Sequence, residues 1–190
     1  MIKKILLILA AIFLTYQSYI LVTRIHNFQA ESWIALFFIA WIINLFITGI
    51  FAFSGFALPT QKLLPESFYT VRNPSALKKI YQSLNVDFFR TFLLATVWRN
   101  KEMRKGYFNG KKTGISNLIT QSKKSEFGHF LPFVIINGVA IYFFMIGHYT
   151  LAIFTLAFNF IGNFYPVLLQ RHHRMRIQRL QKIKQARSIK

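Results

Sequence analysis

The sequence predicts an all-α integral membrane protein with about four transmembrane helices and an amphipathic cytoplasmic loop. The main observation is that residues 127–170 contain no Asp, Glu, Lys or Arg. A helix of that length would reach about 66 Å, whereas a bilayer core is about 30 Å thick, so the stretch should cross the membrane twice. The composition agrees, because hydrophobic residues make up 54% of the chain and charged residues only 15%, unlike a soluble domain.

Two further spans are expected nearer the N-terminus, at about residues 5–23 and 33–55, which are apolar and uncharged. The first follows Lys3 and Lys4, and a basic start before an apolar run is also typical of a signal peptide. No convincing small-residue cleavage site follows it, which favours a retained anchor. With 190 residues, the chain is expected to form a single membrane domain over residues 1–190.

The last two spans are expected at about residues 129–147 and 150–170, joined by a hairpin turn at residues 147–149 that contains a glycine. A loop at residues 60–126 separates the second span from the third. A basic tail at residues 171–190 follows the fourth span.

The basic residues predict the orientation of these spans. Residues 62–126 carry 13 Lys and Arg against 4 Asp and Glu, and the tail carries 8 Lys and Arg and no acid. Loops rich in Lys and Arg stay on the cytoplasmic side of a membrane. The chain is therefore expected to be a multi-pass protein of the cell membrane with the loop and both termini in the cytoplasm.

The loop contains an amphipathic segment, Gln82–Trp98, in which Phe88, Phe92 and other apolar residues recur at near-helical spacing. Two interpretations are open, an interfacial helix lying on the membrane or a plain helix packed over the bundle. The basic, glycine-containing residues 99–112 are expected to form a loop. Residues 115–124 are expected to form a short helix leading into the third span.

The net charge of +19 would suggest nucleic acid as the partner of a soluble chain. Here the charge is segregated from the spans, so membrane lipids and phosphorylated substrates are expected and nucleic acid is not. The chain has no cysteine, which excludes disulfides, zinc–thiolate sites and an acyl intermediate on a protein thiol.

Glu126 and His129 stand at the start of the third span, and residues three apart share one side of a helix. A carboxylate there can hold an imidazole in one tautomer while its other nitrogen takes a proton from a hydroxyl, so both are candidate catalytic residues. The alternative is a pair merely solvated at the interface. The motif is also half of a di-iron pattern, but the chain has five acids and no second such motif, so no metal site is predicted.

Polar residues also line one face of the fourth span with spacings of 4, 3, 4 and 3. These residues are Asn159, Asn163, Pro166, Gln170 and His173. Amides inside a membrane are costly unless they are paired, so they either join helices or serve a substrate. We expect Asn159 to join helices, whereas Asn163 and Gln170 lie nearer the basic boundary and are candidate substrate-binding residues.

The tail begins with arginine, and lysine appears only from residue 182. Arginine is preferred where a planar group makes bidentate contacts to phosphate or carboxylate. Arg171, Arg174 and Arg176 are therefore candidate substrate-binding residues. The alternative is that the cluster acts only as a positive-inside signal.

Two segments carry a resemblance to a known family. The run NFYPVLLQRHHRMR (Asn163–Arg176) and the shorter EFGHFLP (Glu126–Pro132) resemble the glycosyl-4,4'-diaponeurosporenoate acyltransferases. The resemblance implies a bacterial membrane enzyme that transfers a fatty acyl group to a sugar hydroxyl of a glycosylated carotenoid or similar glycolipid. It implies no cofactor, an acyl donor such as an acyl thioester as co-substrate, and a lipid-linked sugar as acceptor. The competing interpretation is a non-enzymatic membrane scaffold or lipid-binding subunit.

Overall fold

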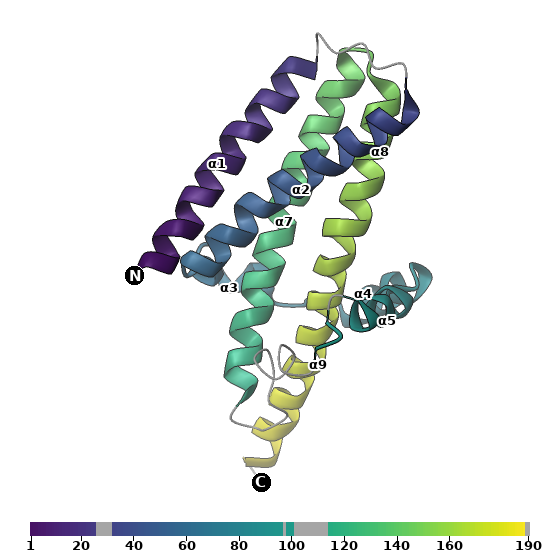
Figure 1. The fold of residues 1–190 in the computed structure, drawn as a ribbon. Coiled ribbons are helices and arrows are strands. Elements are labelled where there is room, and N and C mark those ends of the chain that lie inside the picture. Colours follow the sequence, from purple (N-terminus) through teal and green to yellow (C-terminus); the bar gives the residue numbers. More distant parts are fainter. Residues whose placement is uncertain (26–31, 97, 101–113, 189–190) are drawn as a thin grey trace. The chain divides into compact units, whose positions relative to one another are not determined.

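The computed structural model describes residues 1–25, 32–96, 98–100 and 114–188, and the regular elements in this part of the chain are all helical (Figure 1). Four helices are long and apolar enough to cross a membrane, and they cover Ile2–Arg24, Trp33–Ala57, Ile115–Met145 and Tyr149–Arg179. The predicted all-α membrane fold with four spans is therefore confirmed.

The chain divides into two compact units. The first unit comprises Met1–Thr60 and Phe127–Pro166, and the second comprises Gln61–Glu126 and Val167–Lys190. The elements in chain order are α1 (Ile2–Arg24), α2 (Trp33–Ala57), η2 (Thr60–Lys62), α3 (Glu66–Tyr69), α4 (Pro74–Ser83), α5 (Val86–Ala95), α7 (Ile115–Met145), α8 (Tyr149–Asn159), η4 (Phe160–Phe164) and α9 (Tyr165–Ser188).

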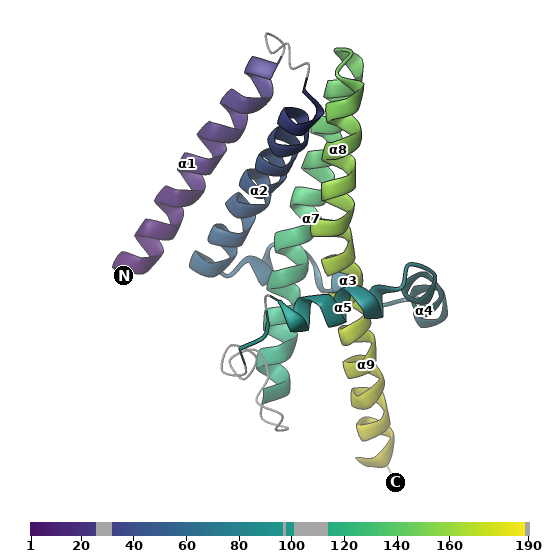
Figure 2. The ribbon, with the colours of Figure 1, turned by 45° about the vertical axis from the view of Figure 1, so that its right-hand side comes forward.

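In the first unit, α1 packs along α2, and α2 packs against α8 (Figure 2). The centre of this unit is apolar and fully buried, with Ile43 of α2, Ile136 and Phe143 of α7 and Leu151 of α8 all at 0% exposure. Many large apolar side chains elsewhere on α1 and α2 are exposed. An exposed apolar surface of this kind fits contact with lipid.

A small residue, Gly49, lies where α2 meets α1. A Cβ atom built on Gly49 of α2 would lie 2.7 Å from Cδ1 of Leu14 in α1, which is closer than real Cβ contacts. Small residues let transmembrane helices approach closely, where van der Waals packing takes the place of the hydrophobic effect.

The predicted hairpin turn between the third and fourth spans is present. The amide of Gly147 donates to the carbonyl of Phe144 at 3.2 Å, and the amide of His148 donates to that of Phe143 at 2.9 Å. Gly147 has a φ of +84°, in the left-handed region that glycine adopts without steric cost. This is a Schellman motif, which ends α7 and allows α8 to begin at Tyr149.

Two expectations about the loop need correction. The helix expected over residues 115–124 is the first part of α7, which runs without a break through Gly128 and Pro132 into the third span. The helix expected over Gln82–Trp98 is divided into α4 and α5 by Asn85, whose φ is +47°. Asparagine adopts this left-handed conformation more readily than most other residues, so it ends α4. Phe88 and Phe92 on α5 are exposed.

The predicted loop at residues 99–112 lies mostly outside the described residues, as does the short connection between the first two spans. The division into lipid-facing and cytoplasmic surfaces likewise stays a prediction.

Candidate functional site

The fourth span contains one turn of π-helix, η4, between α8 and α9. The amide of Tyr165 donates to the carbonyl of Phe160, five residues earlier. Pro166 follows at once, and a proline both lacks an amide hydrogen and crowds the carbonyl four residues before it, here that of Gly162. A widened turn accommodates this crowding, and such π turns are frequent at functional sites. The spacings of four and three between the polar residues predicted a regular helix, so the π turn was not predicted. Pro166 was the one signal for it in the sequence.

Asn163 lies in this turn, is 1% exposed, and joins the imidazole of His129. Its Oδ1 lies 3.2 Å from Nδ1 of His129, and its Nδ2 donates to Oδ1 of Asn159 at 3.1 Å. The hydroxyl of Thr48 on α2 lies 3.0 Å from Asn163 Nδ2 and 3.2 Å from Oδ1. The predicted role of Asn159 in joining helices is confirmed, because its Nδ2 donates to the carbonyl of Phe133 on α7 at 3.0 Å.

One fixed acceptor determines the direction of each hydrogen bond in the series that joins Phe133, Asn159, Asn163 and His129. The carbonyl of Phe133 can only accept, so the NH₂ group of Asn159 faces it and the Oδ1 of Asn159 faces Asn163. Asn163 must therefore donate to that oxygen with its own NH₂ group, which leaves its Oδ1 facing His129. The Nδ1 of His129 is therefore the protonated nitrogen, and in the neutral ring Nε2 carries the lone pair.

The backbone of Gly162 also lies beside the His129 ring. In a regular helix the carbonyl of Gly162 would accept from the amide of residue 166, and proline has none. His129 is half-buried, and its position is set by Asn163 and by this backbone.

In the second unit, the carboxylate of Glu126 is fully buried and binds two arginines. Nε of Arg171 donates to Oε1 at 2.7 Å, and Nη2 of Arg174 donates to Oε2. The same guanidinium groups also donate to backbone carbonyls, Arg174 to Tyr69 at 3.1 Å and Arg171 to Phe68 at 3.5 Å. Each also lies 5.0 Å from the ring centre of that residue. Both oxygens of Glu126 are therefore engaged with arginines, and the residue that holds the imidazole of His129 is Asn163.

The predicted binding residues differ in their surroundings. Arg174 is 2% exposed and Gln170 is 4% exposed, whereas the side chain of Arg171 is 33% exposed and Arg176 is exposed. Asn163 belongs to the first unit and the other four to the second. The catalytic roles of Glu126 and His129 and the binding roles of this set stay predictions.

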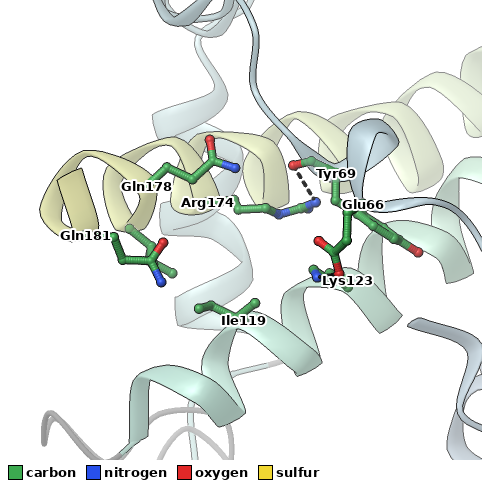
Figure 3. A pocket seen from close by; sticks show the side chains of 8 residues that line it. Glu66, Tyr69, Ile119, Lys123, Arg174, Gln178 and Gln181 are labelled. Atoms are coloured by element: carbon green, nitrogen blue, oxygen red, sulfur yellow. Dashed lines mark hydrogen bonds and ion pairs between the residues drawn. The ribbon is translucent and has the colours of Figure 1, made fainter. Parts of the chain in front are cut away.

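The short helix α3 was not predicted from the sequence, although it supplies partners to the arginines (Figure 3). Tyr69 is buried beneath Arg174 and Lys123, and burial, together with the nearby carboxylate of Glu126, raises the pKa of its phenol to about 12. Glu66 forms an ion pair with Lys123 of α7. The only signal in the sequence was Pro65, which commonly precedes or begins a helix. The spacing of apolar residues gives no indication of these contacts.

Comparison with known proteins decides the family. The family model for glycosyl-4,4'-diaponeurosporenoate acyltransferase matches residues 65–183, which is more than half of the chain. The chain belongs to this family. The resemblance inferred from the two short motifs is thus confirmed. Neither a curated protein nor a solved structure matches the chain.

The segment that matches the glycosyl-4,4'-diaponeurosporenoate acyltransferase family contains both the contact of His129 with Asn163 and the ion pairs of Glu126 with the two arginines. It includes α3 with Tyr69, the Glu126 and His129 positions of α7, and the π turn with Asn163. It excludes α1 and α2, so Thr48, which contacts Asn163, lies outside the matched segment. The matched segment is therefore the part of the chain in which the chemistry of the acyltransferase family should be sought.

Proposed function

We propose that this protein transfers a fatty acyl group to a sugar hydroxyl of a glycosylated carotenoid or a similar glycolipid. The observation that carries the proposal is the hydrogen bond from Nδ1 of His129 to Oδ1 of Asn163 inside the matched family segment. It leaves Nε2 of the neutral imidazole as a proton acceptor at physiological pH. An acyl transfer to an alcohol needs such a base, because a neutral hydroxyl is a weak nucleophile.

The proposed step is direct transfer. As the sugar oxygen attacks the carbonyl carbon of the acyl donor, Nε2 of His129 accepts the hydroxyl proton, and the bond from that carbon to the leaving group breaks. With an acyl thioester as donor, the leaving thiolate takes the proton from the imidazolium, so protons and electrons balance. The chain contains no cysteine, which favours this route over an acyl intermediate on a protein thiol.

Roles for the remaining predicted residues follow from their contacts. Asn163 orients the imidazole, and Glu126 positions the two arginines rather than the histidine. Arg171 is the arginine of the pair with an exposed portion, so it is the better candidate to meet an anionic donor group, together with the exposed Arg176. Gln170 is buried beside them and would support the helix rather than touch the donor.

The proposed location is the cell membrane, with both termini and residues 60–126 in the cytoplasm. The charge distribution supports this arrangement, because the basic segments flank the second, third and fourth spans on one side. Membrane lipids would surround the exposed apolar faces of the spans. Acyl thioesters are made in the cytoplasm, which is the side that would carry Arg171 and Arg176.

A test of the function compares lipid extracts of cells that make a glycosylated carotenoid, with and without this gene. Mass spectrometry should detect a glycoside whose mass is increased by one fatty acyl group only when the gene is present. If the glycoside is unchanged while the protein accumulates in the membrane, the enzymatic proposal is wrong for this acceptor. A membrane scaffold or lipid-binding subunit would give that result.

A further inference from the structure

One face of α5, in the second unit, exposes large apolar side chains. Phe88 is 71% exposed and Phe92 is 55% exposed, and residues four apart lie on the same side of a helix. Ala95, about one turn further along, is exposed as well. Val86, by contrast, is fully buried and fixes the helix to its unit. The helix is therefore apolar on two sides, of which only one is buried.

The α4–α5 pair is attached to α9 at the level where the charged tail begins. The ring of Tyr81 on α4 stacks on the imidazole of His172, with the two ring centroids 3.9 Å apart. The phenol of Tyr81 donates to Oδ1 of Asp87 on α5 at 3.1 Å, and Arg90 pairs with the same oxygen at 3.4 Å. His172 comes directly after Arg171, the first charged residue that follows the uncharged stretch 127–170. These contacts hold α5 beside the point where α9 leaves the predicted span.

The connections of the second unit also keep it close to a membrane. The chain enters this unit from α2 and leaves it through α7, and both helices are long and apolar enough to cross a bilayer. The helix that contains α9 is the fourth candidate span. Within the second unit, α5 runs across α9 rather than along it (Figure 2). A helix lying flat on a membrane surface has this direction relative to a helix that leaves the membrane.

The charge of the second unit fits an anionic surface. Its two segments carry 13 and 8 Lys and Arg, against 4 Asp and Glu in the first and none in the second. Lys78 and Lys79 on α4 and Arg176 on α9 are exposed. Basic segments next to a membrane are attracted by the anionic lipids of the cytoplasmic leaflet. Apolar aromatic residues on one side of a helix and basic residues beside them are typical of a helix at the lipid interface.

The exposed apolar surface of α5 is too small for a stable protein interface. It consists of Phe88, Phe92 and Ala95, whereas a specific protein–protein interface involves about 20–30 residues on each side. Insertion into lipid needs less surface, because an amphipathic helix buries only its apolar face, by about 5–10 Å. A lipid surface therefore fits this face better than a second copy of the chain or another protein.

We propose that α5 lies on the cytoplasmic surface of the membrane and binds anionic phospholipid, with Phe88 and Phe92 inserted among the headgroups. Lys78, Lys79 and Arg176 contact the phosphate groups of the same lipids. Of the two interpretations that the sequence leaves open for this segment, the interfacial helix then holds. This role does not depend on the proposed acyl transfer.

The test measures how each side of α5 sits relative to the bilayer. The full chain, which has no cysteine of its own, receives one nitroxide label at Phe92→Cys or, as the matched control, at Thr91→Cys. Thr91 is exposed and is the neighbour of Phe92 on the polar side of α5. The protein is placed in nanodiscs of equal parts phosphatidylcholine and phosphatidylglycerol.

Electron paramagnetic resonance should show that the label at residue 92 is accessible to oxygen, which concentrates in lipid, and protected from a water-soluble nickel complex. The label at residue 91 should show the reverse. Equal access of the nickel complex to both labels would overturn the proposal.

A second pair of variants tests insertion with the label kept at residue 92. Phe88→Asp places a charge on the apolar side of α5, and Thr91→Asp places the same charge on its polar side. Both positions are exposed, so neither variant disturbs the fold. Loss of one buried phenylalanine should shift the balance from the inserted to the released helix by about 10-fold or more. Access of the nickel complex should therefore rise in Phe88→Asp and stay unchanged in Thr91→Asp, and equal access in the two variants would contradict insertion.

Lipid composition and dilution separate the other occupants of this face. In nanodiscs of phosphatidylcholine alone, access of the nickel complex to residue 92 should rise, because the basic groups lose their anionic partners. Unchanged access would refute the binding of anionic lipid. Spin–spin broadening of the label at residue 92 that disappears when labelled protein is mixed with unlabelled protein would assign the face to a second copy and overturn the proposal.

Discussion

Oδ1 of Asn163 lies 3.2 Å from Nδ1 of His129, and these two atoms set the tautomer of the imidazole. The amide is itself oriented through Asn159 by a backbone carbonyl that can only accept. A side chain in a π turn thus transmits a fixed hydrogen-bond direction to the proposed base. The carboxylate expected for that role, Glu126, holds two arginines instead.

This relationship predicts the behaviour of Asn163 variants. Asn163→Ala removes the acceptor for Nδ1 and should lower kcat by about 2- to 10-fold, the value of one hydrogen bond, with little change in KM. Asn163→Asp retains an acceptor oxygen at the same place and should recover a substantial part of that loss. Steady-state kinetics with an acyl thioester and a glycosylated acceptor measure both. Identical kcat for Asn163→Ala and wild type would show that the asparagine does not orient the base.

The buried Glu126 is predicted to matter first for stability. Glu126→Gln leaves Arg174 buried without its carboxylate, and breaking a buried ion pair in this way typically costs about 3–5 kcal/mol. Glu66→Gln is the matched control, since Glu66 is largely exposed and exposed pairs contribute about 0–1 kcal/mol. Thermal unfolding in detergent should place the midpoint of Glu126→Gln well below that of Glu66→Gln. Equal midpoints would contradict the structural role assigned to Glu126.

Arg171 is predicted to bind the donor through the shape of its guanidinium. Arg171→Lys keeps the charge but loses the planar fork, and a charge-assisted hydrogen bond contributes about 1.5–3 kcal/mol. The KM for the acyl donor should rise by about 10-fold or more, whereas Arg179→Lys on the exposed side of α9 should leave it unchanged. If both variants behave like wild type, the arginine cluster serves only as a topology signal.

The proposed orientation in the membrane can be checked by cysteine labelling, which is simple here because the chain has no cysteine of its own. Cysteines replace Ser32, before α2, and Lys79, on α4; both positions are exposed. An impermeant thiol reagent added to intact cells should label Ser32→Cys and should reach Lys79→Cys only after lysis. Labelling of Lys79→Cys in intact cells would reverse the assigned topology.

Features that depend on local properties could be predicted from the sequence, whereas contacts between distant residues could not. The four spans and the turn at Gly147 follow from local properties, namely a run without charge and a residue that tolerates positive φ. The contact between Asn159 and Asn163 follows from their spacing of four on one helix. The contact of Arg174 with the carbonyl of Tyr69 joins residues 105 positions apart, and no periodicity encodes such a pair.

The π turn was only partly predictable from the sequence. The polar residues before and after Pro166 fit a regular helix on paper, so their spacing favoured an uninterrupted span. The proline imposes a local cost that the chain relieves by widening one turn, and Asn163, which contacts the imidazole, lies in this turn. The contact between Asn163 and His129 also depends on the packing of α7 against η4, which the sequence does not reveal.

The most direct measurement is acyl transfer by the purified protein. Wild-type protein in lipid nanodiscs is incubated with an acyl thioester and a glycosylated carotenoid, and the products are analysed by mass spectrometry, with His129→Ala and His148→Ala as the paired variants. General-base contributions are typically about 10²- to 10⁴-fold, so His129→Ala should lose the acylated product almost entirely, while wild type and His148→Ala, altered only in the hairpin turn, should form it. Absence of product from wild type, or a His129→Ala rate above about a third of the wild-type rate, would contradict the account.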